Sequence, residues 1–266
     1  MTAASRRREI FLDEIGTGPV WIRRDSMPVA PDSVPQGAAI PETDGFADTG
    51  QSASMPPDAG TAFGSAPSVA EIAEMDWARL KTAVAGCVRC GLCKSRTRTV
   101  FGTGDENAKW LFIGEGPGRN EDLQGEPFIG PAGRLLDNML LSMGLKRGEN
   151  AYIANIVKCR PIGPDGRDRP PSPEEASACR PYLERQIALI QPAILIALGK
   201  TAGLSLVGGD PDTPVAQLRG KVHRYNGLPL VVTYHPAYLL RKLTDKAKAW
   251  NDLCLAMDAF ADRQNR

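Results

Sequence analysis

Four short apolar runs, the first of which begins at residue 110, predict the strands of a buried sheet. In chain order they are "WLFIG" (110–114), "AYIANIV" (151–157), "AILIALG" (193–199) and "LPLVVTYH" (228–235). Near-continuous apolar runs of this length are typical of parallel strands that are covered on both faces. Helical stretches separate the runs. The pattern therefore predicts a three-layer α/β/α fold with a small, mostly parallel, four-stranded central sheet.

Helix start signals stand between these runs. A Ser-x-x-Glu capping box occurs at Ser68, ahead of apolar residues with helical spacing, and again at Ser172. Pro131 stands at the first-turn position of a third helix, and a final amphipathic helix is expected over about 245–262. Ligands of parallel sheets bind beyond the carboxyl ends of the strands. We therefore expect the segments that follow the first, second and fourth runs to share one rim.

The N-terminal quarter of the chain has a different composition. Residues 28–69 consist largely of Pro, Gly, Ala, Ser and acidic residues, and no Lys or Arg occurs between Arg24 and Arg79. Such a segment buries too little apolar surface to offset the entropy lost on ordering. We expect residues 1–68 to form an N-terminal tail with a disordered acidic linker, and residues 69–266 to form one folded domain.

The net charge of +1 conceals an uneven distribution. Residues 1–78 carry 5 Lys/Arg against 12 Asp/Glu, whereas residues 79–266 carry 27 against 19. A basic body suits a polyanionic partner, because cationic clusters release counterions when they meet phosphates. An excess of this size is also ordinary scatter for a domain of this length, so charge alone leaves both interpretations open.

The chain has six cysteines. Its N-terminus shows no apolar region of a signal peptide, and no apolar run approaches the roughly 20 residues that span a bilayer. The cysteines therefore indicate metal or redox chemistry. A Cys-x2-Cys knuckle and two distant cysteines provide four thiols for zinc or for an iron–sulfur cluster: Cys87, Cys90, Cys159 and Cys179. Spacing alone does not exclude Cys93, and Cys254 is expected to pack as a small apolar residue on the last helix.

A Gly-rich turn, "GEGPG" (114–118), follows the first apolar run. It is not a dinucleotide fingerprint, because Arg119 stands where the third glycine is required. It is not a phosphate-binding loop either, because no Gly-Lys-Ser/Thr follows. The turn carries acids instead of cations. Taken alone, it could also be a tight strand-to-helix turn whose acids are solvated.

The motifs "GEGPGRNED", "PFIGPAGRLLD", "YIANIVKCRP", "RGK" and "HPAYLLR" follow the Cys87-x2-Cys90 knuckle in this order. Together they resemble the family 4 uracil-DNA glycosylases, which are iron–sulfur members of the uracil-DNA glycosylase superfamily. The resemblance covers roughly Leu80 to Phe260. It implies a DNA repair enzyme of base excision repair that flips uracil out of DNA and hydrolyses its N-glycosidic bond, leaving an abasic site. Residues 69–266 would be its catalytic domain.

The resemblance also implies roles for individual residues. A 4Fe–4S cluster would be held by four cysteines and would leave Cys93 aside: Cys87, Cys90, Cys159 and Cys179. Glu115 and Glu121 would lie near the scissile bond, and His235 would face the uracil oxygen. The base would lie in a pocket formed by Gly116, Gly118, Phe128 and Asn155, with Phe128 stacked on the ring and Asn155 reading its edge.

This set of residues suits the chemistry of glycosidic bond cleavage. A neutral base needs no cation, and glycines allow the backbone to approach a flat ring. Cleavage leaves a sugar with cationic character, which a carboxylate at Glu115 or Glu121 can stabilise while it orients a water molecule. The departing uracil is anionic, and His235 with backbone N–H groups can stabilise its oxygen.

Contacts to the DNA are less sharply indicated. Leu239 and Leu240 follow "HPAY" and are candidates for a wedge that fills the space of the flipped base, although either could instead be packed in the core. Three basic side chains are candidates for phosphate contacts, with solvation as the alternative: Arg219, Lys221 and Arg241. After "KCRP", where the family usually has an Asn-Arg pair, this chain has Asp168-Arg169 in a longer loop.

Two alternatives remain open at the level of sequence. One is a non-catalytic nucleic-acid-binding module stapled by zinc or by an iron–sulfur cluster, and the other is a related glycosylase for another damaged base. A second family of the superfamily bonds covalently to DNA through a "KRRIH" insertion, which this chain lacks. We therefore expect ordinary turnover on uracil-containing DNA, by a monomer in the cytoplasm near the nucleoid and without membrane contact.

Overall fold

The computed structural model describes residues 66–264. The tail and linker expected over residues 1–68 fall outside the described residues, except for the last three. Among these three, Ser68 is the N-cap of the first described helix. The division into a tail and one folded domain therefore stays a prediction.

The four strands expected from the apolar runs are present. They lie parallel to one another in the order β3-β2-β4-β6. Their bounds are β2 (Trp110–Gly114), β3 (Ala151–Asn155), β4 (Ile194–Leu198) and β6 (Leu228–Thr233). Nearly every residue in them is buried, as expected for strands that are covered on both faces.

The sheet has six strands among the described residues, so the expectation of four was wrong. The strand β1 (Thr103–Gly104) pairs antiparallel with β3 at one edge, and β5 (Val222–Tyr225) pairs antiparallel with β6 at the other. The first is only two residues long, and the second has Val222 and Arg224 exposed. Edge strands of this kind carry no continuous apolar run, so the pattern of hydrophobic residues does not indicate them.

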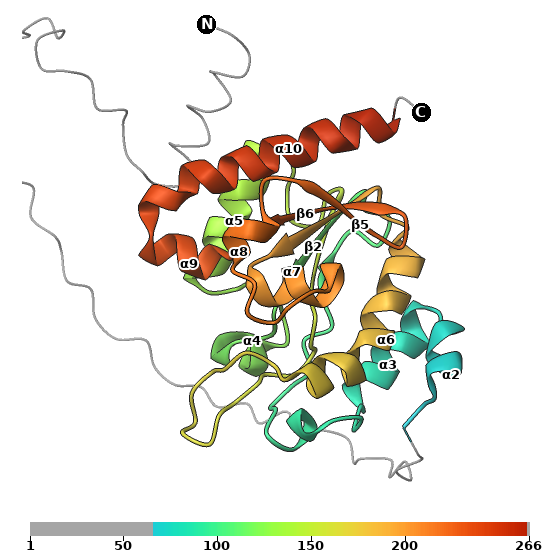
Figure 1. Ribbon diagram of the computed structural model, residues 1–266. Coiled ribbons are helices and arrows are strands. Elements are labelled where there is room, and N and C mark those ends of the chain that lie inside the picture. The colour runs from blue at the N-terminus through green and yellow to red at the C-terminus, as the bar shows by residue number, and fades with distance from the viewer. Residues whose placement is uncertain (1–65, 265–266) are drawn as a thin grey trace, which may run out of the picture. The chain divides into compact units, whose positions relative to one another are not determined.

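Helices cover both faces of the sheet, which confirms the three-layer α/β/α fold (Figure 1). One face packs against α5 (Pro131–Ser142) and α10 (Lys246–Gln264). The other face packs against α3 (Trp77–Ala85), α6 (Pro173–Ile190) and α7 (Lys200–Val207). Successive side chains of a strand point to opposite faces. Accordingly, Leu111 packs on the face that α3, α6 and α7 cover, and its neighbour Phe112 packs on the face that α5 and α10 cover.

The remaining described helices are short. They are α2 (Val69–Ala73), α4 (Arg119–Gln124), α8 (Val215–Leu218) and α9 (Pro236–Arg241), with the 3-10 turns η2 (Gly91–Lys94) and η3 (Leu243–Asp245). Both predicted capping boxes, at Ser68 and Ser172, are formed. The helical pattern that begins at Ser68 is interrupted, because Asp76 caps a new helix by accepting a hydrogen bond from the Arg79 N–H at 2.8 Å.

None of the helices in residues 66–264 combines the length and the apolar character that crossing a membrane requires.

The strand register sets the position of the functional rim. In the parallel pairing of β2 and β3, Gly114 lies opposite Asn155 at the carboxyl ends of the two strands. The strand β6 ends two residues before His235, which is the N-cap of α9. The rim predicted from the apolar runs is therefore confirmed, since the segments that follow β2, β3 and β6 line one cleft.

Candidate active site and cysteine centre

A cleft of about 550 Å³ lies at this rim. It is lined by all seven residues that the sequence places in the catalytic and base-binding sets: Glu115, Gly116, Gly118, Glu121, Phe128, Asn155 and His235. Two further residues line the cleft: Arg241, which the sequence indicates for the DNA, and Asp168. Segments that are more than a hundred residues apart in the chain therefore meet at one site.

Gly114 allows the strand end to come close to two of these side chains. A Cβ atom at this position would lie 2.5 Å from Asn155 Oδ1 and 2.6 Å from Phe128 Cζ. Any larger residue would push the ring and the amide away from the backbone. Gly114 therefore serves the close approach of the Phe128 ring and the Asn155 amide to the end of β2.

Phe128 is held in a rare backbone conformation. Its φ of 55° lies in the left-handed region, which a bulky residue seldom occupies. The guanidinium of Arg147 donates hydrogen bonds to the carbonyl oxygens of Pro127 at 2.9 Å and Phe128 at 2.8 Å. The Phe128 ring stacks on His235 with 5.5 Å between the ring centroids. Strain of this kind is typical of functional sites, where surrounding contacts hold the side chain in place.

Asn155 presents an unsatisfied hydrogen-bond acceptor. Its side chain is only 2% exposed, and its Oδ1 atom has no hydrogen-bond partner in the part of the chain that the structure describes. An unpaired buried polar atom costs about 1–3 kcal/mol. The amide is therefore suited to a ligand that brings an N–H donor into the cleft.

His235 is a neutral hydrogen-bond donor. Its Nδ1 accepts a hydrogen bond from the Ala237 N–H at 3.1 Å as part of the cap of α9. Burial, with a smaller contribution from Arg241, lowers the pKa of His235 to about 4. At neutral pH the single ring proton must then be on Nε2, because Nδ1 is an acceptor. The cleft thus contains a donor that carries no positive charge.

The acids of the Gly-rich turn have different positions. Glu121 lies in the first turn of α4, and its Oε1 accepts a hydrogen bond from the Ile129 N–H at 3.2 Å, which ties it to the Phe128 loop. Glu115 lies in the turn itself, where its carbonyl oxygen accepts from the Val157 N–H at 3.3 Å. Both line the cleft.

The third acid of this stretch, Asp122, is directed away from the cleft. It is buried, and its carboxylate accepts hydrogen bonds from the backbone N–H groups of Thr97 at 2.9 Å and Arg98 at 3.4 Å. Asp122 thereby fastens α4 to the segment that follows the cysteine knuckle.

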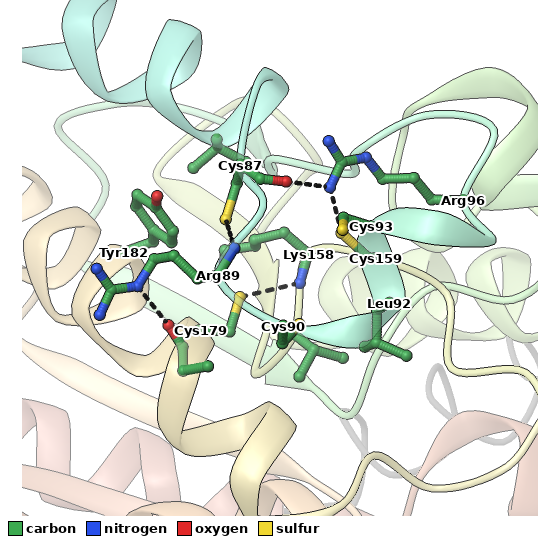
Figure 2. A pocket seen from close by; sticks show the side chains of 13 residues that line it. Cys87, Arg89, Cys90, Leu92, Cys93, Arg96, Lys158, Cys159, Cys179 and Tyr182 are labelled. Atoms are coloured by element: carbon green, nitrogen blue, oxygen red, sulfur yellow. Dashed lines mark hydrogen bonds between the residues drawn. The ribbon is translucent and has the colours of Figure 1, made fainter. Parts of the chain in front are cut away.

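Five cysteines line a second, smaller cavity (Figure 2): Cys87, Cys90, Cys93, Cys159 and Cys179. Cys254 lies elsewhere and packs against the core beside α5 and α10, as expected. Burial raises the pKa of the Cys159 thiol to about 11 and that of Cys179 to about 12. Within residues 66–264, no three Cys, His, Asp or Glu side chains are arranged to hold a single metal ion.

The surroundings of the cysteines suit bound thiolates. Three of the sulfur atoms accept hydrogen bonds from N–H groups, as Figure 2 shows. The donors are the backbone of Arg89 to Cys87 at 3.5 Å, the backbone of Lys158 to Cys179 at 3.3 Å, and the guanidinium of Arg96 to Cys159 at 3.3 Å. Cysteines that line one cavity, with N–H donors and cations beside them, fit the donor set that an iron–sulfur cluster requires.

The structure corrects two of the expected DNA contacts. Leu239 is 1% exposed and packs in the core between α5 and α10, so it is not free to act as a wedge, whereas Leu240 is 41% exposed. Arg219 pairs with Asp252 through two contacts of 2.9 Å and lies over the Tyr234 ring, so it is a structural residue. Both corrections concern side chains whose direction depends on tertiary packing.

The other two basic candidates remain accessible. Lys221 is exposed on the surface, and Arg241 lines the cleft. Asp168 pairs with Arg160, with 2.5 Å between Oδ1 and Nε. Asp168, which lines the cleft, therefore offsets the positive charge of Arg160.

Two residues that hold the backbone of cleft residues in place are not indicated by any sequence motif. Arg147 holds the Phe128 backbone from a loop 19 residues away. Lys158 is buried beside the cysteines, where its Nζ donates a hydrogen bond to the Asn155 carbonyl oxygen at 2.9 Å, and burial lowers its pKa to about 8. The position of Lys158 within the apolar run "NIVKC" could have indicated its importance, since a lysine is almost never fully buried unless it is paired.

Comparisons with known proteins agree with this geometry. Residues 101–254 match the uracil DNA glycosylase superfamily. A type-4 uracil-DNA glycosylase of Archaeoglobus fulgidus is 42% identical over 163 residues, which cover 59% of this chain and 79% of that protein. The type-4 enzyme of Thermotoga maritima is 40% identical, covering 61% and 82%. That of Pyrobaculum aerophilum is 36% identical, covering 71% and 97%.

Proposed function

This chain belongs to the uracil-DNA glycosylase superfamily and within it to the type-4 enzymes, and from that premise we propose that it removes uracil from DNA. The reaction is hydrolysis of the N-glycosidic bond, which leaves an abasic site for base excision repair. The observation that carries the proposal is the buried, unpaired Oδ1 of Asn155 in a cleft whose wall is a stacked Phe128–His235 pair.

Base recognition follows from the chemistry of uracil. The edge of uracil offers a carbonyl acceptor at position 4 beside an N–H donor at position 3. The Asn155 amide can pair with both at once, and the N–H then satisfies Oδ1. Phe128 supplies a flat apolar surface for the ring, and Gly116 and Gly118 of the turn line the cleft with it.

Bond cleavage separates two charges. As the bond to the base breaks, the sugar gains cationic character, and the carboxylates of Glu115 and Glu121 stabilise it and orient the attacking water. The base leaves as an anion. The Nε2–H of the neutral His235 donates a hydrogen bond to the developing oxyanion, and such a donor typically contributes about 3 kcal/mol to lowering the barrier.

The DNA must present a flipped nucleotide to the cleft, at a cost of a few kcal/mol. Leu240 is exposed and precedes Arg241 of the cleft, so it can fill the vacated stack. Arg241 lies on the cleft and Lys221 on the surface, where each can meet a phosphate. The carboxylate of Asp168 in the cleft wall offsets the charge of Arg160, which an Asn at position 168 would not do.

The cysteine centre holds a 4Fe–4S cluster in this proposal. The ligands are Cys87, Cys90, Cys159 and Cys179, with Cys93 beside them in the cavity wall. When bound, the cluster supplies four iron–thiolate bonds that cross-link the knuckle before β2 to the loop after β3 and to α6. The support is the shared cavity and the N–H donors to three of the sulfur atoms. The protein would work as a monomer where the cell keeps its DNA, and its tail would take no part in the chemistry.

The proposal is tested with two oligonucleotides that differ only at one position, which is uracil in one and thymine in the other. Abasic sites are scored by alkaline strand cleavage after incubation with the iron-loaded protein, both single-stranded and in duplex. We expect cleavage of the uracil substrate alone. Absence of abasic sites in both uracil substrates would leave the non-catalytic nucleic-acid-binding module as the better account.

A further inference from the structure

Lys158 lines the cysteine cavity and is hydrogen-bonded to Asn155, which lines the cleft. Its side chain is 1% exposed and lines the cysteine cavity (Figure 2). The Nζ atom donates a hydrogen bond to the carbonyl oxygen of Asn155 at 2.9 Å, and the backbone N–H donates to Cys179 Sγ at 3.3 Å. One buried residue thereby links the base-reading strand end to a candidate cluster ligand.

A buried ammonium group needs a negative partner, because an unpaired charge in the interior is costly. Among the residues that the structure describes, no carboxylate lies within ion-pair distance of Lys158. The groups that can supply negative charge beside it are the cysteine sulfurs of the same cavity, among which Cys179 Sγ accepts the Lys158 backbone N–H at 3.3 Å. Thiols are neutral, whereas thiolates bound to iron are not.

We propose that Lys158 is a positioning residue that couples the cysteine centre to base recognition. The negative charge of the loaded centre holds its ammonium group in place, and that group fixes the carbonyl of Asn155. The side chain of Asn155 then meets the edge of the base in the correct orientation. This inference rests on the proposed function and assigns the centre a role in substrate selection that passes through one side chain.

Arg96 provides the matched control. Its guanidinium also brings a positive charge to the centre, with Nη1 3.3 Å from Cys159 Sγ. Its other hydrogen bonds go to the carbonyl oxygens of Cys87 at 2.6 Å and Ala85 at 3.1 Å, on the side of the knuckle. Removing either cation should therefore affect the centre in the same direction, but only Lys158 reaches Asn155.

The experiment compares Lys158→Met with Arg96→Met. Two readouts are independent of turnover by the loaded enzyme: iron content and the reduction potential of the centre. Both variants should retain iron, and both potentials should shift to more negative values, since the loss of a nearby positive charge disfavours the added electron. The third readout is inhibition of excision by free uracil. We expect about a tenfold weaker inhibition for Lys158→Met, which loses a charge-assisted hydrogen bond, and a change of less than about twofold for Arg96→Met.

A Lys158→Gln variant separates the hydrogen bond from the charge. Its amide still donates to the Asn155 carbonyl, so inhibition by uracil should recover to within about threefold of wild type while the potential stays shifted. Wild-type inhibition in an iron-loaded Lys158→Met protein would overturn the proposal, and so would an equal loss in Arg96→Met. Loss of iron from both Lys158 variants, with iron retained in Arg96→Met, would also contradict it, because Lys158 would then serve assembly of the centre. An inactive wild-type enzyme in the same assay would instead mark failure of the proposed function.

Discussion

Replacement of Asn155 by Asp should redirect base selection. In the structure the Asn155 amide is buried and its Oδ1 is unpaired, so its preference is fixed by the groups that a base presents. With Asp, a carboxylate oxygen faces the uracil carbonyl where an N–H stood before. Cytosine, by contrast, offers an amine donor at that position.

The magnitude follows from two mismatched polar contacts. Each unpaired buried group costs about 1–3 kcal/mol, so two mismatches amount to roughly two to four orders of magnitude in rate. Single-turnover excision from oligonucleotides with one uracil or one cytosine measures this directly. We expect Asn155→Asp to lose uracil excision by that factor while its barrier against cytosine falls, and Asn155→Ala to weaken uracil excision without favouring either base.

The control is the fold, because Asn155 contributes recognition rather than stability. Circular dichroism and iron content should match those of the wild type in both variants. A correctly folded, iron-loaded Asn155→Ala protein that excises uracil at the wild-type rate would refute the assignment. The amide would then serve only to end the strand β3.

Further predictions concern acid, the cluster and the tail. Because burial lowers the pKa of His235 from its usual 6.5 to about 4, His235 stays neutral in the folded enzyme and excision should not decline through its protonation until the pH nears 4. The unfolded chain takes up this proton near pH 6.5, so the contribution of His235 to stability should fall between pH 6.5 and 4, as thermal unfolding would show. Cys159→Ala should give insoluble or iron-free protein, since metal binding is coupled to folding, whereas Cys93→Ala should keep the visible iron–sulfur absorbance; the reverse pattern would show that the ligands are misassigned. A chain starting at Ser68 should retain excision, because an acidic tail can only compete with DNA for the basic domain at low salt. A loss of activity beyond about tenfold would show that the tail takes part.

The buried parts of the fold could be predicted from the sequence because they obey a local rule. An all-apolar run such as 194–198 is too short for a typical helix and favours a strand covered on both faces. The capping residues Ser68 and Ser172 mark helix starts by their own hydrogen bonds. No local sequence pattern indicates the edge strand at 222–225, because its conformation depends on pairing with β6. The break between α2 and α3 depends on one cap, at Asp76, within an otherwise helical pattern.

The site was predictable where motifs place polar groups at strand ends, as with Asn155 and His235. It was not predictable where a side chain acts across the fold. Leu239 and Leu240 are neighbours on α9, and only the packing of that helix decides which of them is buried. Arg219 looks like a free cation in the sequence, but its partner Asp252 lies 33 residues away on α10.

The products of the reaction test most directly whether the protein hydrolyses the bond between uracil and the sugar. Iron-loaded protein is incubated with an excess of uracil-containing DNA, and free uracil is quantified by mass spectrometry alongside abasic sites. The account predicts equal molar amounts of uracil and abasic sites, in excess of the enzyme, because water completes the reaction and releases the protein. Absence of free uracil, or DNA that stays covalently bound to the protein after one turnover, would contradict it.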